Sequence, residues 1–282
     1  MHNRTILARD VMTRRPITIP PEASARRWAV PLVVALVLLA ASPGSGRVAT
    51  TAMSTCDMRY PSDVRVAWVC RTLARERVEV LFGEQWVDVL RFNRIDRRHA
   101  VAGVSLKVPR RLREIRAFTP MPATYPDAAG EAKFLLIDLS EQFLGAYERG
   151  RLVFSSPLSA GDVEHPTPTG DFTISAAHRD HSSSLYTIQD MDVPYPMTWA
   201  LRFHISREGI SFWLHGRDIP GYPGSHGCIG LYDEWMQQSY YAAPARPVLD
   251  DARRLYEWAG GAGANDSQLR SIVGPRLRIT RG

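Results

Sequence analysis

Over most of its length the sequence lacks a surplus of either charge. Its formal net charge is +6, but residues 1–52 hold seven Arg against two acids, and the 28 basic and 27 acidic residues that follow nearly cancel. A body without a basic surplus offers no continuous positive face to a phosphate backbone. We therefore expect no nucleic-acid partner.

The sequence also has little apolar sequence of membrane-spanning length. The apolar run at residues 28–41 counts 14 residues, whereas a transmembrane helix needs about 20. Arg26 and Arg27 precede the run and small residues follow it through Ala52, which is the order of an export signal. We expect residues 1–52 to be a leader and signal peptide. The mature chain would then lie in the periplasm or cell envelope, with a membrane contact only through this signal; a membrane anchor or a buried helix is the alternative.

Cysteine is scarce, with three residues in the whole chain. Cys56 and Cys70 lie 14 positions apart, and in an oxidising compartment such a pair can close a disulfide loop. That bridge would contribute about 3 kcal/mol through loop-closure entropy. Lipid attachment at Cys56 is the alternative. A bridge leaves Cys228 as an odd thiol that needs an explanation.

Two segments follow the leader, joined by a Pro-rich stretch at residues 117–130 that suits a semi-rigid linker. In the first segment, residues 53–116, the spacing from Trp86 to Asn93 is helical, and Gly103 leads into the strand pattern "VSLKV". This order resembles the second half of a LysM domain, a small module that binds the glycan of peptidoglycan. We expect a small α+β LysM-like domain here, with a packing domain that binds no ligand as the alternative.

The second segment, residues 131–282, is mostly short strand patterns separated by Gly and Pro turns. Alternation in "GISFWLHG" places Trp213 and His215 on one face of a strand, and the polar stretch "HRDHSSS" indicates a loop. Because the strands are many, the helices few and βαβ spacing absent, we expect a mainly β domain. A β-sandwich or open barrel with a few peripheral helices fits this pattern.

The stretch "GSHGCIGL" at residues 224–231 surrounds Cys228 with the groups that a thiol nucleophile needs. A thiol with a pKa of about 8.5 requires a basic neighbour, and we expect His215, at the end of the preceding strand, to be the general base and acid. His226 is too near in sequence for in-line proton abstraction and would support the site. Gly227 permits a tight turn, so that the amides of residues 226–228 converge on one oxygen as an oxyanion hole.

Zinc binding is the alternative for this cluster, because imidazole and thiolate are common zinc ligands. The candidate ligands would be His204, His215, His226 and Cys228. Their spacing matches no common zinc pattern, so the sequence favours a thiol enzyme.

One signature in this segment resembles that of a known family. It consists of His215-Gly216, a Gly/Pro loop, and then Ser225-His226-Gly227-Cys228-Ile229. It resembles the signature of the L,D-transpeptidases, the YkuD-type cell-wall enzymes. The stretches "LLIDLSEQFLGAY", "TPTGDFTI" and "VPYPMTW" precede it in the family's order, so that the resemblance covers roughly residues 131–282.

The resemblance implies a YkuD-like β-sandwich with Cys228 as nucleophile, His215 as base and the amides around Gly227 as oxyanion hole, without metal or organic cofactor. It implies cleavage of the L,D bond before the terminal D-Ala of a peptidoglycan stem peptide, through a thioester. An amine of another stem, or of an anchored protein, would then accept the acyl group. With water as acceptor the chain would be a carboxypeptidase or crosslink hydrolase, and a non-catalytic peptidoglycan-binding module is a third possibility.

The chain departs from the family pattern at Gly230, where relatives commonly carry Arg or Asn. Arg217, in the compact loop "HGRDIPGYPG", is the expected replacement, because a guanidinium can bind a substrate carboxylate bidentately. The expected substrate contacts are Tyr195, Trp213, Gly216, Arg217 and Ser225.

Overall fold

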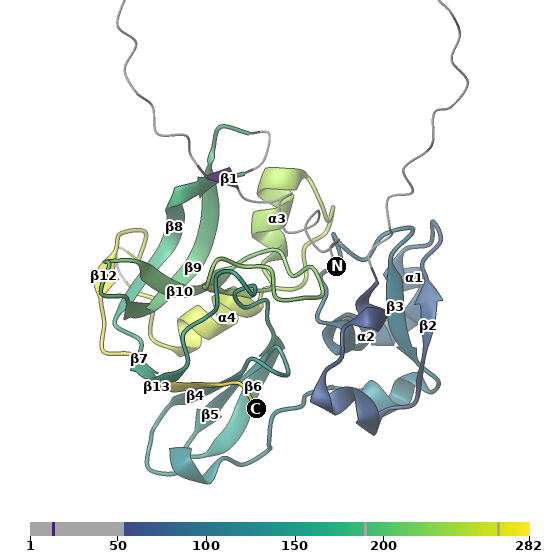
Figure 1. Cartoon of the computed structure of the whole chain (residues 1–282), viewed down its shortest axis with the longest axis horizontal. Helices are drawn as coiled ribbons and strands as arrows, with labels where there is room; N and C mark the ends of the chain where they lie inside the picture. The colour runs from purple at the N-terminus through teal and green to yellow at the C-terminus, as the bar shows by residue number, and fades with distance from the viewer. Residues whose placement is uncertain (1–12, 15–53, 189–190, 264–265) are drawn as a thin grey trace, which may run out of the picture.

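The structure is a computed structural model that describes residues 13–14, 54–188, 191–263 and 266–282 (Figure 1). The predicted leader and signal peptide therefore lies outside the described residues, apart from β1 (Thr13–Arg14), which pairs with β8. Among the helices that the structure describes, none is both long and apolar enough to cross a membrane.

The larger of two sheets in the second segment has six strands. Its order is β1-β8-β9-β10-β11, with β12 paired to β8. The bounds are β8 (Ala176–Thr187), β9 (Pro194–Ile205), β10 (Ser211–Gly216), β11 (Ile229–Leu231) and β12 (Arg270–Ser271). Only β10 and β11 run parallel among these pairs, so the loop between them crosses from one end of the sheet to the other.

The second sheet has five strands in the order β6-β5-β4-β13-β7. Its strands are β4 (Phe134–Asp138), β5 (Phe143–Glu148), β6 (Arg151–Pro157), β7 (Gly170–Thr173) and β13 (Arg276–Thr280). Strand β13 runs parallel to β4 and antiparallel to β7. Strand β13, the last in the chain, thus lies between β4 and β7, and it pairs with β4 from about 140 residues earlier in the sequence. Such long-range pairing depends on the whole domain.

The main core fills the space between the two sheets and helix α4 (Asp251–Trp258). Leu135 and Ile137 project into it from β4, and Leu214 and Ile229 from β10 and β11. Alternate residues of each strand face this core, as half-buried strands require. Helix α3 (Glu234–Tyr241) follows β11. The prediction of a mainly β domain with a few helices is confirmed.

Residues 54–116 form a smaller part beside the two sheets, called the module from here on (Figure 1). Strands β2 (Trp68–Thr72) and β3 (Ser105–Pro109) pair antiparallel, with α1 (Val78–Phe82) and α2 (Trp86–Asn93) between them in sequence. Short 3₁₀ helices complete it: η2 (Thr55–Asp57), η3 (Pro61–Arg65), η4 (Gly83–Gln85) and η5 (Leu112–Ile115). A disulfide joins Cys56 to Cys70 and so ties η2 to β2.

The apolar core of the module is not closed on itself. Buried side chains of α2, such as Val89 and Leu90, pack in one cluster with Ile219, Tyr232 and Leu249 from the second segment. The module therefore completes its core only against the domain beside it.

The Pro-rich stretch at residues 117–130 contacts both parts through a few of its side chains, although most of its residues are exposed. The ring of Phe118 meets Phe92 of α2 edge-on at 5.1 Å between centroids and Phe143 of β5 at 6.0 Å. Further along, η6 (Pro126–Ala128) buries Ala128 in a cluster with Phe134. This stretch therefore fixes the module against the smaller sheet.

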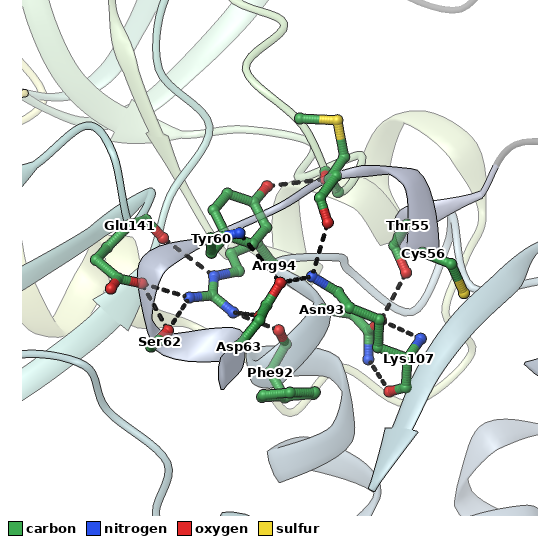
Figure 2. Close-up of polar contacts among 12 residues, drawn as sticks. Thr55, Cys56, Tyr60, Ser62, Asp63, Phe92, Asn93, Arg94, Lys107 and Glu141 are labelled. Atoms are coloured by element: carbon green, nitrogen blue, oxygen red, sulfur yellow. Dashed lines mark hydrogen bonds and ion pairs between the residues drawn. The ribbon is translucent and has the colours of Figure 1, made fainter. Parts of the chain in front are cut away.

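A buried set of charged and polar side chains, here the Arg94 cluster, lies at the same interface; Figure 2 shows it. Its members are Ser62, Asp63, Arg94, Lys107 and Glu141. Arg94 follows α2 and donates to Glu141 Oε2 at 2.9 Å, to the Glu141 carbonyl at 3.0 Å and to Ser62 Oγ at 2.9 Å. Lys107 Nζ lies 2.7 Å from Asp63 Oδ2. Because Glu141 belongs to the β4–β5 turn, these bonds join the module to the domain.

Candidate active site

Cys228 lies directly before β11, on the face of the larger sheet that points away from the main core. Leu214 of β10 pairs with Ile229 of β11, and both side chains enter the core. Neighbouring residues along a strand face opposite ways, so Cys228 packs beside Trp213 in a separate cluster. Its thiol is free and partly exposed.

His215 shares that outer face with Cys228. The strand register pairs His215 with Gly230, two residues beyond Cys228, so that the two side chains lie on the same side of neighbouring strands. His215 Nδ1 lies 2.8 Å from the carbonyl oxygen of Gly216. A carbonyl only accepts hydrogen bonds, so Nδ1 carries the proton and Nε2 keeps the lone pair that a general base needs.

Burial makes both groups neutral in the resting site. It lowers the pKa of His215 to about 3 and raises the pKa of the Cys228 thiol to about 11. A hydrogen bond from the Trp213 backbone and the charge of Arg217 favour the thiolate, but burial outweighs them. A nucleophilic role would therefore require this thiol to pass its proton to a positioned base.

The backbone turn at Gly227 can be made only by glycine. Its φ is +103°, and a Cβ at this position would lie 2.6 Å from Cε1 of Phe212, closer than non-bonded carbon atoms approach. Thr167 Oγ1 donates to the Gly227 carbonyl at 2.9 Å. The turn is thus fixed by a ring on one side and a hydroxyl on the other.

The predicted oxyanion hole differs from the structure in one amide. The N–H of Gly227 donates to Ser225 Oγ at 3.1 Å, and that hydroxyl donates in turn to the Cys228 carbonyl at 2.5 Å. Ser225 is buried, and its hydroxyl joins the Gly227 amide to the Cys228 carbonyl within the turn. Oxyanion donation by the amides of His226 and Cys228 stays a prediction.

His226 has its ring in an aromatic stack beside the turn. Its centroid lies 4.3 Å from that of Tyr186, with the planes 25° apart, and 4.6 Å from that of His165. Asp162 holds His165 by accepting from its backbone N–H at 2.7 Å. These contacts fix the orientation of the His226 ring, in keeping with a supporting role.

Arg217 occupies the space that a side chain at position 230 would need. A Cβ on Gly230 would lie 2.7 Å from Arg217 Cβ and 2.8 Å from its Cδ. The guanidinium is buried and donates to the carbonyl of Gly224 at 2.8 Å. Arg217 therefore lies beneath the turn as a support, and its binding of a substrate carboxylate stays a prediction.

The other predicted substrate contacts form the wall behind the site. Tyr195 is fully buried, and Trp213 is 5% exposed with its ring 4.3 Å from that of His181. A Cβ on Gly216 would lie 2.5 Å from Asp233 Oδ2, so Gly216 permits close packing against the cap of α3. These three residues, like Ser225, shape the site from within.

His181 is a residue of this wall that sequence reasoning missed. The polar stretch "HRDHSSS" predicts a loop, but it lies within β8, where pairing with β9 satisfies its backbone. Nδ1 of His181 lies 3.1 Å from Nδ1 of His178, and burial lowers the pKa of His181 to about 4. Its pairing with Trp213 depends on tertiary contacts, and no local pattern indicates it.

The four candidate zinc ligands do not come together as one group. Within the described parts of the chain, the only His, Cys, Asp or Glu side chains close enough to share an ion are Asp96, His99 and Asp218. Their oxygen atoms already accept hydrogen bonds from Gln237 and from the backbone of Ile219. His204 instead packs against Phe172 and Phe212.

Residues 132–265 match the family model of the L,D-transpeptidase catalytic domain, YkuD. No curated protein sequence is similar enough to the chain to count as a match.

Solved structures also resemble the chain. L,D-transpeptidase 1 of Mycobacterium tuberculosis is 17% identical over 52% of this chain and 61% of its own, with a TM-score of 0.34. The L,D-transpeptidase of Xylanimonas cellulosilytica is 20% identical over 76% and 97%, with a TM-score of 0.42. That of Stackebrandtia nassauensis is 17% identical over 71% and 67%, with a TM-score of 0.38. The chain thus spans about six tenths of the length of the Mycobacterium tuberculosis structure.

Proposed function

We propose that this chain, whose residues 132–265 form a YkuD L,D-transpeptidase catalytic domain, is an exported cysteine acyltransferase that crosslinks peptidoglycan stem peptides. The observation that carries the proposal is the placement of His215 and Cys228 on one sheet face, with the imidazole held in its Nδ1–H form by the Gly216 carbonyl. A neutral base beside a neutral thiol suits acyl transfer through a thioester.

In the proposed reaction, Cys228 Sγ attacks the carbonyl carbon of the L,D bond before the terminal D-Ala. His215 Nε2 takes the thiol proton and delivers it to the departing amine, so that the C–N bond breaks, D-Ala leaves and a thioester remains. The amide of Cys228 faces the oxyanion as it forms. The amine of a second stem then attacks the thioester, its proton passes through His215 to sulfur, and the new amide bond restores the thiol.

Arg217 has a supporting role in this proposal. Its bond to the Gly224 carbonyl and its contact with Gly230 hold the floor of the turn that carries Cys228. Its fixed charge also favours the thiolate as it develops. A change from Arg217 to Ala should therefore slow acylation more than it weakens substrate binding.

The acceptor defines the alternatives. With water in place of the second amine, the same thioester would make the chain a carboxypeptidase or crosslink hydrolase, and an anchored protein is another possible amine source. A site that no longer acylates would leave a peptidoglycan-binding module. The identity of the products distinguishes these outcomes.

Export and glycan binding complete the proposal. The disulfide between Cys56 and Cys70 supports an oxidising compartment. The resemblance of residues 53–116 to a LysM domain supports contact with the glycan strand. Sedimentation of the whole protein with insoluble peptidoglycan should retain both the wild type and the Cys228→Ala variant, and no retention would remove the glycan-binding role.

Intact-mass measurement after incubation with a carbapenem, and product analysis with a disaccharide-tetrapeptide, test the reaction. We expect one covalent adduct on the wild type, none on Cys228→Ala, and an unchanged adduct on His204→Ala, a histidine of the same sheet outside the site. Crosslinked dimers would identify a transpeptidase, and shortened monomers a carboxypeptidase. An adduct that persists in Cys228→Ala would refute the assignment of the nucleophile.

A further inference from the structure

The loop from Arg217 to Gly224 connects the base to the nucleophile, and the module holds its centre. Ile219 N–H donates to Asp96 Oδ2 at 2.7 Å, while Asp96 N–H donates to the Ile219 carbonyl at 2.7 Å. Ile95 and Pro220 pair as an isolated β-bridge. Backbone and side-chain hydrogen bonds from the module therefore hold the centre of this loop.

Two further hydrogen bonds join the module to neighbouring residues of the loop. Tyr60 donates its hydroxyl to the Gly221 carbonyl at 3.1 Å, and Arg98 Nε donates to Asp218 Oδ1 at 3.1 Å. Asp218 is 1% exposed. Two segments of the module, at Tyr60 and at residues 95–98, thus contact the loop from residue 218 to residue 221.

Gln237 of α3 links these contacts to the domain. Its side-chain NH₂ donates to Asp96 Oδ2 at 2.7 Å and to Asp218 Oδ1 at 2.8 Å. All three side chains are buried, so removal of one partner would leave a carboxylate or amide without its hydrogen bonds in a site closed to water. Asp96 is the centre of this set, because it also accepts from the backbone of His99 at 2.9 Å.

The sandwich itself holds the two ends of the loop. Arg217 N–H donates to the Leu231 carbonyl at 2.9 Å, and Gly224 N–H donates to Ser159 Oγ at 3.2 Å. The first end follows Gly216, whose carbonyl orients His215. Only two residues, Arg217 and Asp218, separate Gly216 from Ile219, so a displacement of the loop centre acts on the residue that orients the base.

We propose that the module is a positioning element of the active site, with Asp96 as the residue through which it fixes the loop and so the orientation of His215. The effect on acylation rests on the proposed function, whereas the effect on the loop does not.

The test uses Asp96→Asn in the mature protein, with Glu141→Gln as a matched control. The first variant keeps the size of the side chain but turns one acceptor into a donor that faces Gln237. The control weakens the Arg94 cluster across the same interface without touching the loop. Hydrogen exchange by mass spectrometry follows the peptide that covers residues 217–224, and carbapenem acylation is followed as a rate constant.

For Asp96→Asn we expect hydrogen exchange in the loop to rise and the acylation rate constant to fall, each by about tenfold or more. A tenfold change corresponds to the loss of one hydrogen bond to a charged group. Glu141→Gln should lower the melting temperature and leave both loop measurements at wild-type values. Tyr60→Phe, which removes a single hydroxyl at the loop, should give a smaller rise in loop exchange and serves if Asp96→Asn does not fold.

If the loop of Asp96→Asn exchanged at the wild-type rate, the proposal would be overturned; the same holds for Tyr60→Phe where Asp96→Asn does not fold. The proposal would also be overturned if Glu141→Gln slowed acylation as much as these variants do. A wild-type protein that forms no adduct would sink the proposed function instead, and the exchange measurement would still decide whether the module holds the loop.

Discussion

The Arg94 cluster is buried and charged, whereas the pair of buried His215 and partly exposed Cys228 is neutral. Arg94 and Lys107 lie against Glu141 and Asp63, at 2.9 and 2.7 Å respectively. Burial still lowers the pKa of Lys107 to about 8, partly offset by the hydrogen bond that Lys107 donates to Asp63. A buried charge persists where an opposite charge and hydrogen bonds surround it.

Both groups of the pair of His215 and Cys228 stay neutral, because burial disfavours the imidazolium and the thiolate more than their neighbours stabilise them. Arg217 is the charged neighbour of both, and it opposes protonation of His215 as well as favouring the thiolate. The Arg94 cluster therefore holds two parts of the chain together, whereas in the proposed mechanism a proton passes from the Cys228 thiol to His215. Substitutions in the two places should separate stability from reactivity.

The largest effect is expected on reactivity, from His215→Asn. The Asn amide can still donate to the Gly216 carbonyl, but it provides no base, so carbapenem acylation should slow by about 10² to 10⁴. Stopped-flow or intact-mass kinetics would measure the rate, with thermal unfolding as the check that the fold is kept. His226→Asn should slow acylation much less, and an equal loss in both variants would contradict the assignment of the base.

Arg94→Ala should have the opposite effect: a loss of stability with little change in the acylation rate. It leaves Glu141 buried without its cation and Asp63 with Lys107 alone, which is expected to lower the free energy of unfolding by about 3–5 kcal/mol. Denaturant titration measures that change. Below the unfolding transition, the folded molecules should still acylate at nearly the wild-type rate. A small loss of stability would mean that the cluster is hydrated or rearranges.

A smaller effect should appear in the pH dependence of stability. The pKa of His215 is about 3 in the folded chain and about 6.5 in an unfolded chain, so between these values the unfolded state binds more protons. Stability is then full above pH 6.5 and falls as the pH falls. From pH 7 to pH 5 this one group should remove about 2 kcal/mol. Denaturant titrations of wild type and His215→Asn at both pH values give the difference, and parallel curves would show that His215 is not buried as a neutral ring.

Local sequence predicted much of the catalytic arrangement. The alternation of "GISFWLHG" placed Trp213 and His215 on one face, because side chains alternate in any strand. The need for glycine at position 227 also follows from the turn alone, and its positive φ bears this out. The helix from Trp86 and the strand after Gly103 formed where their spacing predicted.

Contacts between distant segments were beyond such reasoning. The packing of the stretch at 117–130, the pairing of "HRDHSSS" within β8 and the position of Arg217 beneath Gly230 each depend on which surfaces meet after folding. Composition favours a loop for "HRDHSSS", and its pairing with β9 overrides that preference.

By itself, therefore, the sequence predicted Cys228 as nucleophile and His215 as base, and it determined that Trp213 and His215 share one face of a strand, because this follows from the period of a strand. The tertiary structure alone decided that Ser225 takes the Gly227 amide, that burial leaves thiol and imidazole neutral, and that Asp96 reaches the loop between them. Hydrogen bonds and burial of this kind join residues as far as 123 positions apart, and such distances are set only when the whole chain is packed.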